Sequence, residues 1–195
     1  AVISGGHTNF VHIERDGEVL FDNRGDGSED GGSEDVRLSM RLVYDFAMTT
    51  PLSELRFILD ARRLNKSIAE QSFAGKYGHS VGRTLHSARQ RQIMGDSTFS
   101  RMISYTTAAC DARMAGAPIA VMSNSGSGNQ GIAATLPVVV YAEETFASEE
   151  QTVRALVLSH LTVIYIKQSL GRLSALCGCV VAATGSACAL CYLMG

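Results

Sequence analysis

Residues 149–170, EEQTVRALVLSHLTVIYIKQSL, constrain the fold more than any other part of the sequence. Ser148 and Gln151 have the spacing of a capping box, which predicts the start of a helix. Gly171 predicts the end of that helix. From Ala155 to Ile166 apolar side chains occupy nearly every face, so other elements have to cover this helix on all sides. We therefore expect it to lie at the centre of a helical fold.

The N-terminal part has a different pattern. Alternating residues in NFVHIE and RDGEVLF flank Asp16-Gly17, which predicts a β-hairpin. Residues 23–35 are acidic and rich in glycine, as is typical of a mobile surface loop. A length of 195 residues favours one domain. We expect a single α+β domain over 1–195, mainly α-helical, in which 1–35 are β-rich and 36–195 are helical.

Local signals predict two further helices within the helical part. Thr50 as N-cap and Pro51 at the first helical position indicate that one helix starts there. An amphipathic run that carries Val81, Leu85 and Ile93 predicts another.

Charge and hydropathy exclude several classes of function. The net charge of −2, with basic residues scattered among acids, disfavours nucleic-acid binding. The first ten residues, AVISGGHTNF, lack the pattern of a signal peptide. Residues 173–195 carry no charge and are long enough to span a bilayer, but they are rich in Ala, Gly, Ser and Cys. We expect a buried helix there, with a membrane anchor as the alternative. A cytoplasmic protein is expected, and the apolar C-terminal helix favours a homo-oligomer.

The uncharged stretch MSNSGSGNQG, residues 122–131, lies between two apolar runs. Its glycines match the dinucleotide fingerprint formally, but that site requires a helix here, and Pro137 is expected to break it. Apolar neighbours argue against a linker. A tight turn and an anion-binding loop remain equally open. Arg113, just upstream, is suited to bind a substrate carboxylate, or else to pair with Asp111.

Four of the five cysteines lie close together, at Cys177, Cys179, Cys188 and Cys191. Their spacings can ligate zinc or an iron–sulfur cluster. Four thiolates on one straight helix cannot surround a metal, and the only other cysteine is Cys110. Small core residues in a tightly packed helix are the alternative interpretation.

The histidines give weaker signals. His160 is aligned with apolar residues of its helix, which is typical of a core histidine. His7, beside glycines, is a weak candidate for a catalytic residue. The three others, His12, His79 and His86, are expected at the surface or at helix caps.

Six stretches together resemble one family over nearly the whole chain: GGHTNFVHIE, RFILDARRLN, DARMAGAP, MSNSGSGNQGIAATLPVVV, RALVLSHLTVIYIK and GRLSALCG. The family is the L-cysteine desulfidases, which are related to the alpha-chain domain of iron–sulfur L-serine dehydratases. The resemblance implies a pyridoxal-independent lyase with a [4Fe–4S] cluster. Such an enzyme degrades L-cysteine to pyruvate, ammonia and sulfide, or L-serine to pyruvate and ammonia.

The resemblance also implies roles for particular residues. Cys177 would ligate the cluster, with Cys179 as the fallback. The loop would hold the carboxylate of a small amino-acid substrate, and its candidate residues are Ser125, Ser127, Gly128, Asn129 and Gln130.

Family members are about twice as long as this chain. We therefore expect the central fragment of such an enzyme, which alone lacks a complete cluster and is inactive. The alternative is a non-catalytic domain that binds a small ligand or an anion.

Overall fold

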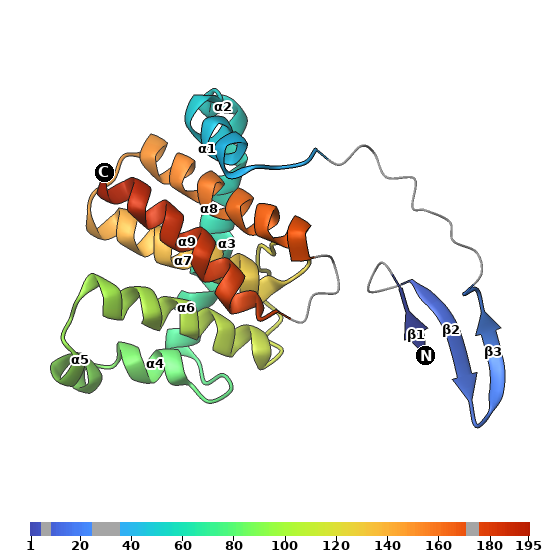
Figure 1. Ribbon diagram of the computed structural model, residues 1–195. Coiled ribbons are helices and arrows are strands. Elements are labelled where there is room, and N and C mark those ends of the chain that lie inside the picture. The colour runs from blue at the N-terminus through green and yellow to red at the C-terminus, as the bar shows by residue number, and fades with distance from the viewer. Residues whose placement is uncertain (5–8, 25–35, 171–175) are drawn as a thin grey trace.

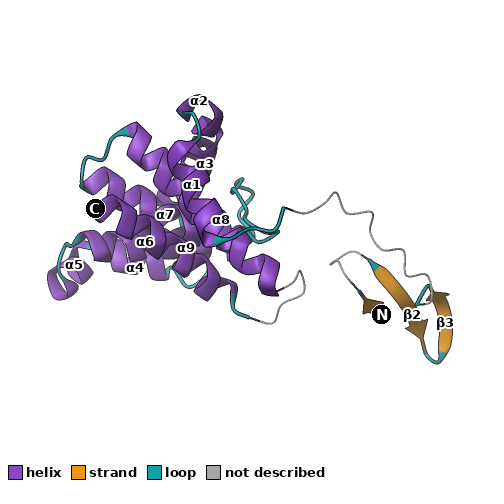
Figure 2. Cartoon of the chain, turned by 45° about the horizontal axis from the view of Figure 1, so that its top comes forward, coloured by secondary structure: helices purple, strands orange, loops and turns teal. Residues whose placement is uncertain are grey.

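The computed structural model describes residues 1–4, 9–24, 36–170 and 176–195. In these ranges a small antiparallel sheet at the N-terminus is followed by a body of helices, which confirms the expected α+β, mainly helical fold. In Figures 1 and 2 the strands stand apart from the helices. The helical elements in chain order are α1 (Met40–Thr49), α2 (Leu52–Leu55), the 3-10 turn η1 (Arg56–Ile58), α3 (Leu59–Ala74), α4 (Val81–His86), α5 (Ala88–Met94), α6 (Thr98–Met114), α7 (Gly128–Glu144), α8 (Glu149–Leu170) and α9 (Gly178–Met194).

The sheet has the order β1 (Val2–Ile3), β2 (Phe10–Arg15) and β3 (Glu18–Asp22). Asp16 and Gly17, both at positive φ, form the predicted hairpin turn.

His12 corrects one expectation, because it is buried rather than at the surface or at a cap. Glu14 is on the same face of β2, and Asp22 is the cross-strand partner of His12. Each carboxylate has an oxygen 3.4 Å from a ring nitrogen. Strand alternation therefore places the imidazole between two acids. Of the expected acidic loop at 23–35, residues 25–35 lie outside the described residues.

Helix α8 contacts α1, α7 and α9 (Figure 1), and most of its residues from Thr152 to Val163 are buried, as expected for a central helix. Ile164 is exposed, so the expected cover on all sides is incomplete near its C-terminal end. Its capping box forms as expected: Ser148 Oγ accepts from Gln151 N at 3.2 Å, and Gln151 Oε1 accepts from Ser148 N at 2.9 Å. Helix α9 approaches α8 closely at Gly185, where an added Cβ would touch the Ser159 carbonyl oxygen. Close packing through a small residue thus joins the last helix to the core.

None of the helices in the described parts of the chain is long and apolar enough to cross a membrane. The uncharged C-terminal segment instead forms α9, which buries Val181, Ala182 and Ala189 and leaves Val180 and Met194 exposed. This packing agrees with the buried helix expected for the C-terminal segment.

Two predicted helix boundaries are wrong. Thr50 is the C-cap of α1, where its N–H donates to Phe46 O, and Pro51 is the residue before α2 rather than its first residue. The amphipathic run from Val81 is two helices, because Ser87 adopts an extended conformation and caps α5 by accepting from the N–H of Gln90.

His86, at the end of α4, also differs from its expected surface position. It is half-buried and stacks on Phe73, with ring centroids 4.0 Å apart. Burial lowers its pKa from the ordinary value. His79 is exposed, as expected.

Pro137 lies inside α7 and does not end it, so the prediction of a broken helix is wrong. Proline in a helix interior removes one hydrogen bond and costs roughly 3 kcal/mol. Leu136, Val138, Val139 and Val140 around it are buried, and each such side chain contributes about 1.5–3 kcal/mol. Burial of α7 therefore outweighs the cost of the proline. The dinucleotide fingerprint belongs to a parallel βαβ unit, whereas the strands described here form an antiparallel sheet and none of them leads into the glycine-rich stretch.

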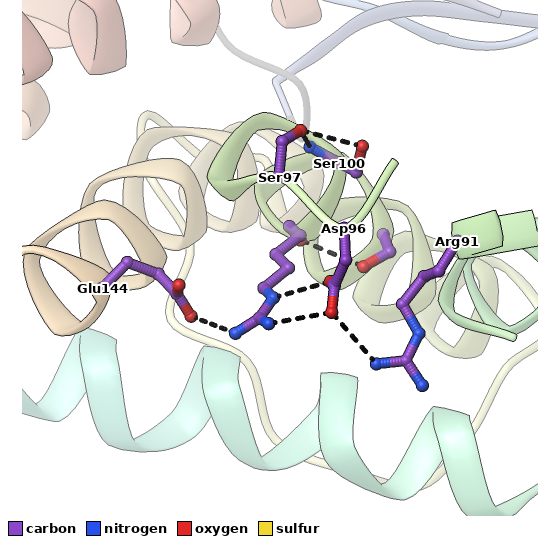
Figure 3. Close-up of polar contacts among 7 residues, drawn as sticks. Arg91, Asp96, Ser97, Ser100 and Glu144 are labelled. Atoms are coloured by element: carbon purple, nitrogen blue, oxygen red, sulfur yellow. Dashed lines mark hydrogen bonds and ion pairs between the residues drawn. The ribbon is translucent and has the colours of Figure 1, made fainter. Parts of the chain in front are cut away.

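Charged side chains fix the C-terminal end of α7 to the start of α6 (Figure 3). Asp96 accepts two hydrogen bonds from Arg101, at 3.0 and 3.1 Å, and lies 3.7 Å from Arg91. The other side of the Arg101 guanidinium donates to Glu144. Arg101 lowers the pKa of Asp96 through these hydrogen bonds. These contacts join the C-terminal end of α7 to α6, at the end opposite to the glycine-rich stretch.

Candidate functional site

The stretch 122–131 combines a tight turn with the start of a helix. Asn124 and Ser127 exchange both backbone hydrogen bonds, at 3.0 and 2.9 Å. The two residues between them, Ser125 and Gly126, have φ of 48° and 77°. Positive φ at both central positions is typical of a type I′ turn. The tight-turn interpretation is therefore correct, although it describes only half of the stretch.

The other half is the N-terminus of α7. Ser127 is its N-cap and accepts a hydrogen bond from the N–H of Gln130. An added Cβ at Gly131 would overlap the carbonyl of Met122, so only glycine lets the backbone at Met122 lie this close to the start of α7. The first backbone N–H groups of a helix have no acceptor within the helix and carry partial positive charge. The stretch thus also provides the group that an anion requires.

Arg113, at the C-terminal end of α6, adds a full positive charge to this helix start. Its guanidinium lies against Gly128, where an added Cβ would overlap it, and its Nη1 donates to Asn129 Oδ1 at 3.1 Å. The expected alternative, a salt bridge to Asp111, does not form. That carboxylate accepts from Gly82 N instead, and no ion pair of Arg113 occurs within the described ranges. Arg113 is thus suited to bind an external carboxylate.

Gln130 connects the start of α7 to the start of α9. Its side chain packs against Gly178, where there is no room for a Cβ. It is 7% exposed, and its Oε1 has no hydrogen-bond partner in the described part of the protein. A buried amide oxygen without a partner is costly, which makes it a candidate to bind a donor supplied from outside.

Cys177 is the N-cap residue of α9 and directly precedes Gly178, which Gln130 contacts. It is exposed, and the backbone N–H groups of Cys179 and Val180 hold the pKa of its thiol below the ordinary value. Burial raises the pKa of Cys110 on α6 to about 11, and nearby Cys179 adds to the rise. Cys177 is therefore the cysteine of this group that is best suited to bind a metal as a thiolate.

The described residues do not complete a metal site. None of their histidine, cysteine, aspartate and glutamate side chains form a group of three or more that could hold a metal ion. Cys188 and Cys191 are further along α9, half-buried and exposed. An iron–sulfur cluster bound at Cys177 would need ligands from outside the described residues, and so no catalytic step through a cluster follows from them.

On another side of the turn, a buried hydrogen-bond network holds the loop in place. Asn124 Nδ2 contacts His160 Nδ1 at 3.0 Å, and Thr135 Oγ1 contacts His160 Nε2 at 2.9 Å. Asn65 joins Thr135 and the Met122 backbone to this network. Burial lowers the pKa of His160 to about 4. His160 is a satisfied core histidine, as predicted, whereas its partner Asn124 and the connected Asn65 were missed because they are distant in sequence.

A cavity of about 290 Å³ opens beside this network. Its walls are mainly apolar and include no charged residue. The polar residues of the lining are Ser123, Asn124 and Ser125 of the loop and His160 of α8. The lining comprises Phe46, Phe57, Ile58, Met122, Ser123, Asn124, Ser125, Val157, His160, Leu161 and Ile164. The loop residues with polar side chains thus border different regions: Ser125 lines the cavity, Asn129 contacts Arg113 of α6, and Gln130 contacts the start of α9. His7, the weak catalytic candidate, lies outside the described residues.

Comparison with known proteins gives one family. Residues 32–195 match the family model of the serine dehydratase alpha chain. Similar curated proteins include the UPF0597 protein BF3560 of Bacteroides fragilis and a UPF0597 protein of Bacteroides thetaiotaomicron, both 65% identical over 195 residues. A UPF0597 protein of Phocaeicola vulgatus is 61% identical over 196 residues. Each match covers 100% of this chain and 46% of the relative, so the chain spans about half the length of these relatives. No solved structure matches the chain significantly.

Proposed function

Since the chain belongs to the serine dehydratase alpha-chain family, we propose that it is part of a pyridoxal-independent lyase that eliminates the β-substituent of L-cysteine or L-serine. L-cysteine would yield pyruvate, ammonia and sulfide, as in L-cysteine desulfidases, and L-serine would yield pyruvate and ammonia. The names of the UPF0597 relatives specify no activity, so the substrate is part of the proposal.

One observation carries the proposal: the first turn of α7 contacts the Arg113 guanidinium through Gly128 and Asn129, and the start of α9 through Gln130. The guanidinium of Arg113 and the first N–H groups of α7 would bind the substrate carboxylate, because both are positive and neither is neutralised by a described acid. Asn129, which Arg113 contacts, would fix the orientation of the guanidinium. Gln130 would accept a hydrogen bond from a donor on the substrate. Ser127 caps the helix, so its contribution is to hold the N–H groups in position.

A [4Fe–4S] cluster would supply Lewis-acid chemistry at the leaving group. Of the described residues, Cys177 is the proposed ligand and Cys179 the fallback. Because the relatives are about twice as long as this chain, the other ligands would come from residues outside it. The chain by itself would then be inactive.

The test uses the protein encoded by the complete reading frame, reconstituted anaerobically with iron and sulfide. We expect pyruvate to form from L-serine or L-cysteine, with sulfide released in the second case. A protein that binds either amino acid at equilibrium without forming pyruvate would instead support the alternative, a non-catalytic ligand-binding domain. A protein that neither binds iron nor forms pyruvate would exclude the lyase.

A further inference from the structure

The two faces of the N-terminal sheet differ in chemistry. Ile13 on β2 pairs with Phe21 on β3, so these two apolar side chains project together from one face. His12 pairs with Asp22 and projects from the other face, where the imidazole lies between Asp22 and Glu14. An antiparallel sheet commonly packs one such face against a core and leaves the other in solvent. The face with Ile13 and Phe21 is the one suited to be covered.

Large apolar side chains of the sheet are nevertheless exposed, to fractions between 37% and 57%: Val2, Ile3, Phe10, Val19, Leu20 and Phe21. Among the described elements the strands pack closely only against one another, and the sheet stands apart from the helices in Figures 1 and 2. Because β1 has only two residues, the sheet is little more than a hairpin, which is marginally stable in water by itself. The described residues thus do not supply the element that this sheet needs to pack against.

The comparisons assign the sheet to a longer polypeptide and separate it from the helical body. The serine dehydratase alpha-chain model matches residues 32–195, which contain all of the described helices and none of the strands. The UPF0597 relatives, in contrast, align with the whole of this chain, strands included. The match covers 46% of each of these relatives, so more than half of their length lies outside it. The sheet is therefore shared with longer relatives but is not part of the matched alpha-chain region.

We propose that the face of the sheet that carries Ile13 and Phe21 packs against an apolar segment of the same polypeptide that lies outside these 195 residues. A segment of the same chain is favoured over a second copy, because the covalent connection gives it a high effective concentration. Sheet and segment together form a structural unit of their own, distinct from the helical body, in place of the single domain expected over 1–195. The inference does not depend on the lyase activity, and its tests need no turnover, so the two can fail independently.

Hydroxyl-radical footprinting of the complete reading-frame protein measures whether Phe21 is covered. The Phe21 side chain is 44% exposed in the structure, and Phe146, which is 93% exposed, serves as the reference. We expect Phe21 to lose most of the reactivity that it has in the urea-unfolded protein, whereas Phe146 should keep its reactivity. Protection of Phe21 that disappears on dilution would assign the face to a second copy. Equal reactivity of Phe21 in the native and the unfolded protein would mean that nothing covers it. Either result would overturn the proposal.

A substitution identifies the segment that covers the face. Phe21→Asp would place a charge in the proposed contact, so hydrogen exchange measured by mass spectrometry should become faster in β2, in β3 and in peptides outside these 195 residues. Exchange in α3, α7 and α8 should stay unchanged. Phe146→Asp, the same change at an exposed position, is the matched control and should leave the sheet and the outside peptides unchanged.

Three results of the exchange experiment would contradict the proposal. Faster exchange in the helices but not in peptides outside these 195 residues would mean that the sheet packs on the helical body. Unchanged exchange in every outside peptide would mean that no such segment covers Phe21. Equal effects of Phe21→Asp and Phe146→Asp on the sheet would mean that the contact is not specific to this face. If Phe21→Asp does not fold, Phe21→Ser is the milder variant for the same comparison.

Discussion

His160 shows how one buried side chain links stability to the shape of the loop. Its ring nitrogens contact Asn124 and Thr135, and burial lowers its pKa to about 4. Protonation would place an N–H at Nδ1 directly against the N–H of Asn124, so the charged form is excluded by geometry as well as by desolvation.

Acid should therefore destabilise the protein through this residue. A histidine whose pKa is lower in the folded state is equally neutral in both states above its unfolded pKa of 6.5, and the unfolded state alone gains a proton as the pH falls towards about 4. The free energy of unfolding should fall by roughly 3 kcal/mol over this range. Urea unfolding at pH 7, 5.5 and 4.5 measures it, with His160→Asn as the non-titrating control. If wild type and variant lose stability equally, the lowered pKa is wrong.

For His160, the sequence predicted a buried core histidine but not the residues that contact it. Apolar neighbours at helical spacing were enough to place His160 in the core. Asn65, Asn124 and Thr135 come from three different elements, and no local pattern announces that they meet. The surface position expected for His12 was wrong for the same reason, because strand pairing brings Asp22 close to it.

Helix α7 is the element that sequence reasoning interpreted least well. Pro137 has a strong local preference against a helix interior, but the burial of its neighbours decides the outcome. By contrast, the capping box at Ser148 depends only on residues three positions apart, and it was predicted correctly. The capping box was therefore predictable from neighbouring residues alone. The helical conformation around Pro137 was not, because tertiary packing overrides the local preference of proline.

The contact between α8 and α9 depends on Gly185. Gly185→Ala should lower the free energy of unfolding by about 1–3 kcal/mol, because the added methyl group would press on the Ser159 carbonyl. Ala183→Ser, at an exposed position of α9, should change it by less than about 0.5 kcal/mol. Chemical denaturation of the two variants provides the comparison. Equal free energies of unfolding in the two variants would mean that α8 and α9 can move apart slightly without loss of stability.

For the whole molecule, the fold class and the relation to the serine dehydratase alpha-chain family were recognisable from sequence, whereas the arrangement of the candidate site residues was not. Arg113, the glycine-rich loop and Cys177 were each identified separately. Their convergence depends on how α6, α7 and α9 pack, which the sequence does not reveal. The role of Gln130 as the connection between two helix starts became visible only in three dimensions.

Cys177 and Cys191 should differ in their effect on iron binding in the complete reading-frame protein. Cys177→Ser should abolish the broad absorbance expected at about 400 nm after anaerobic reconstitution and lower the iron content. Cys191→Ser, at an exposed position on the same helix, should leave both unchanged. Iron analysis alongside the spectrum distinguishes loss of the cluster from a change in its colour. An equal loss of absorbance and iron in the two variants would mean that Cys177 is not the specific ligand.

The central claim is that the substrate carboxylate binds where Arg113 of α6 meets the start of α7. The most direct measurement is kcat/KM for pyruvate formation by Arg113→Gln, beside Arg113→Lys and an exposed control, Arg89→Gln. We predict a loss on the order of one hundred-fold for Arg113→Gln, mainly through KM, a smaller loss for Arg113→Lys, and none for the control. An Arg113→Gln enzyme with the kcat/KM of the wild type would contradict the claim.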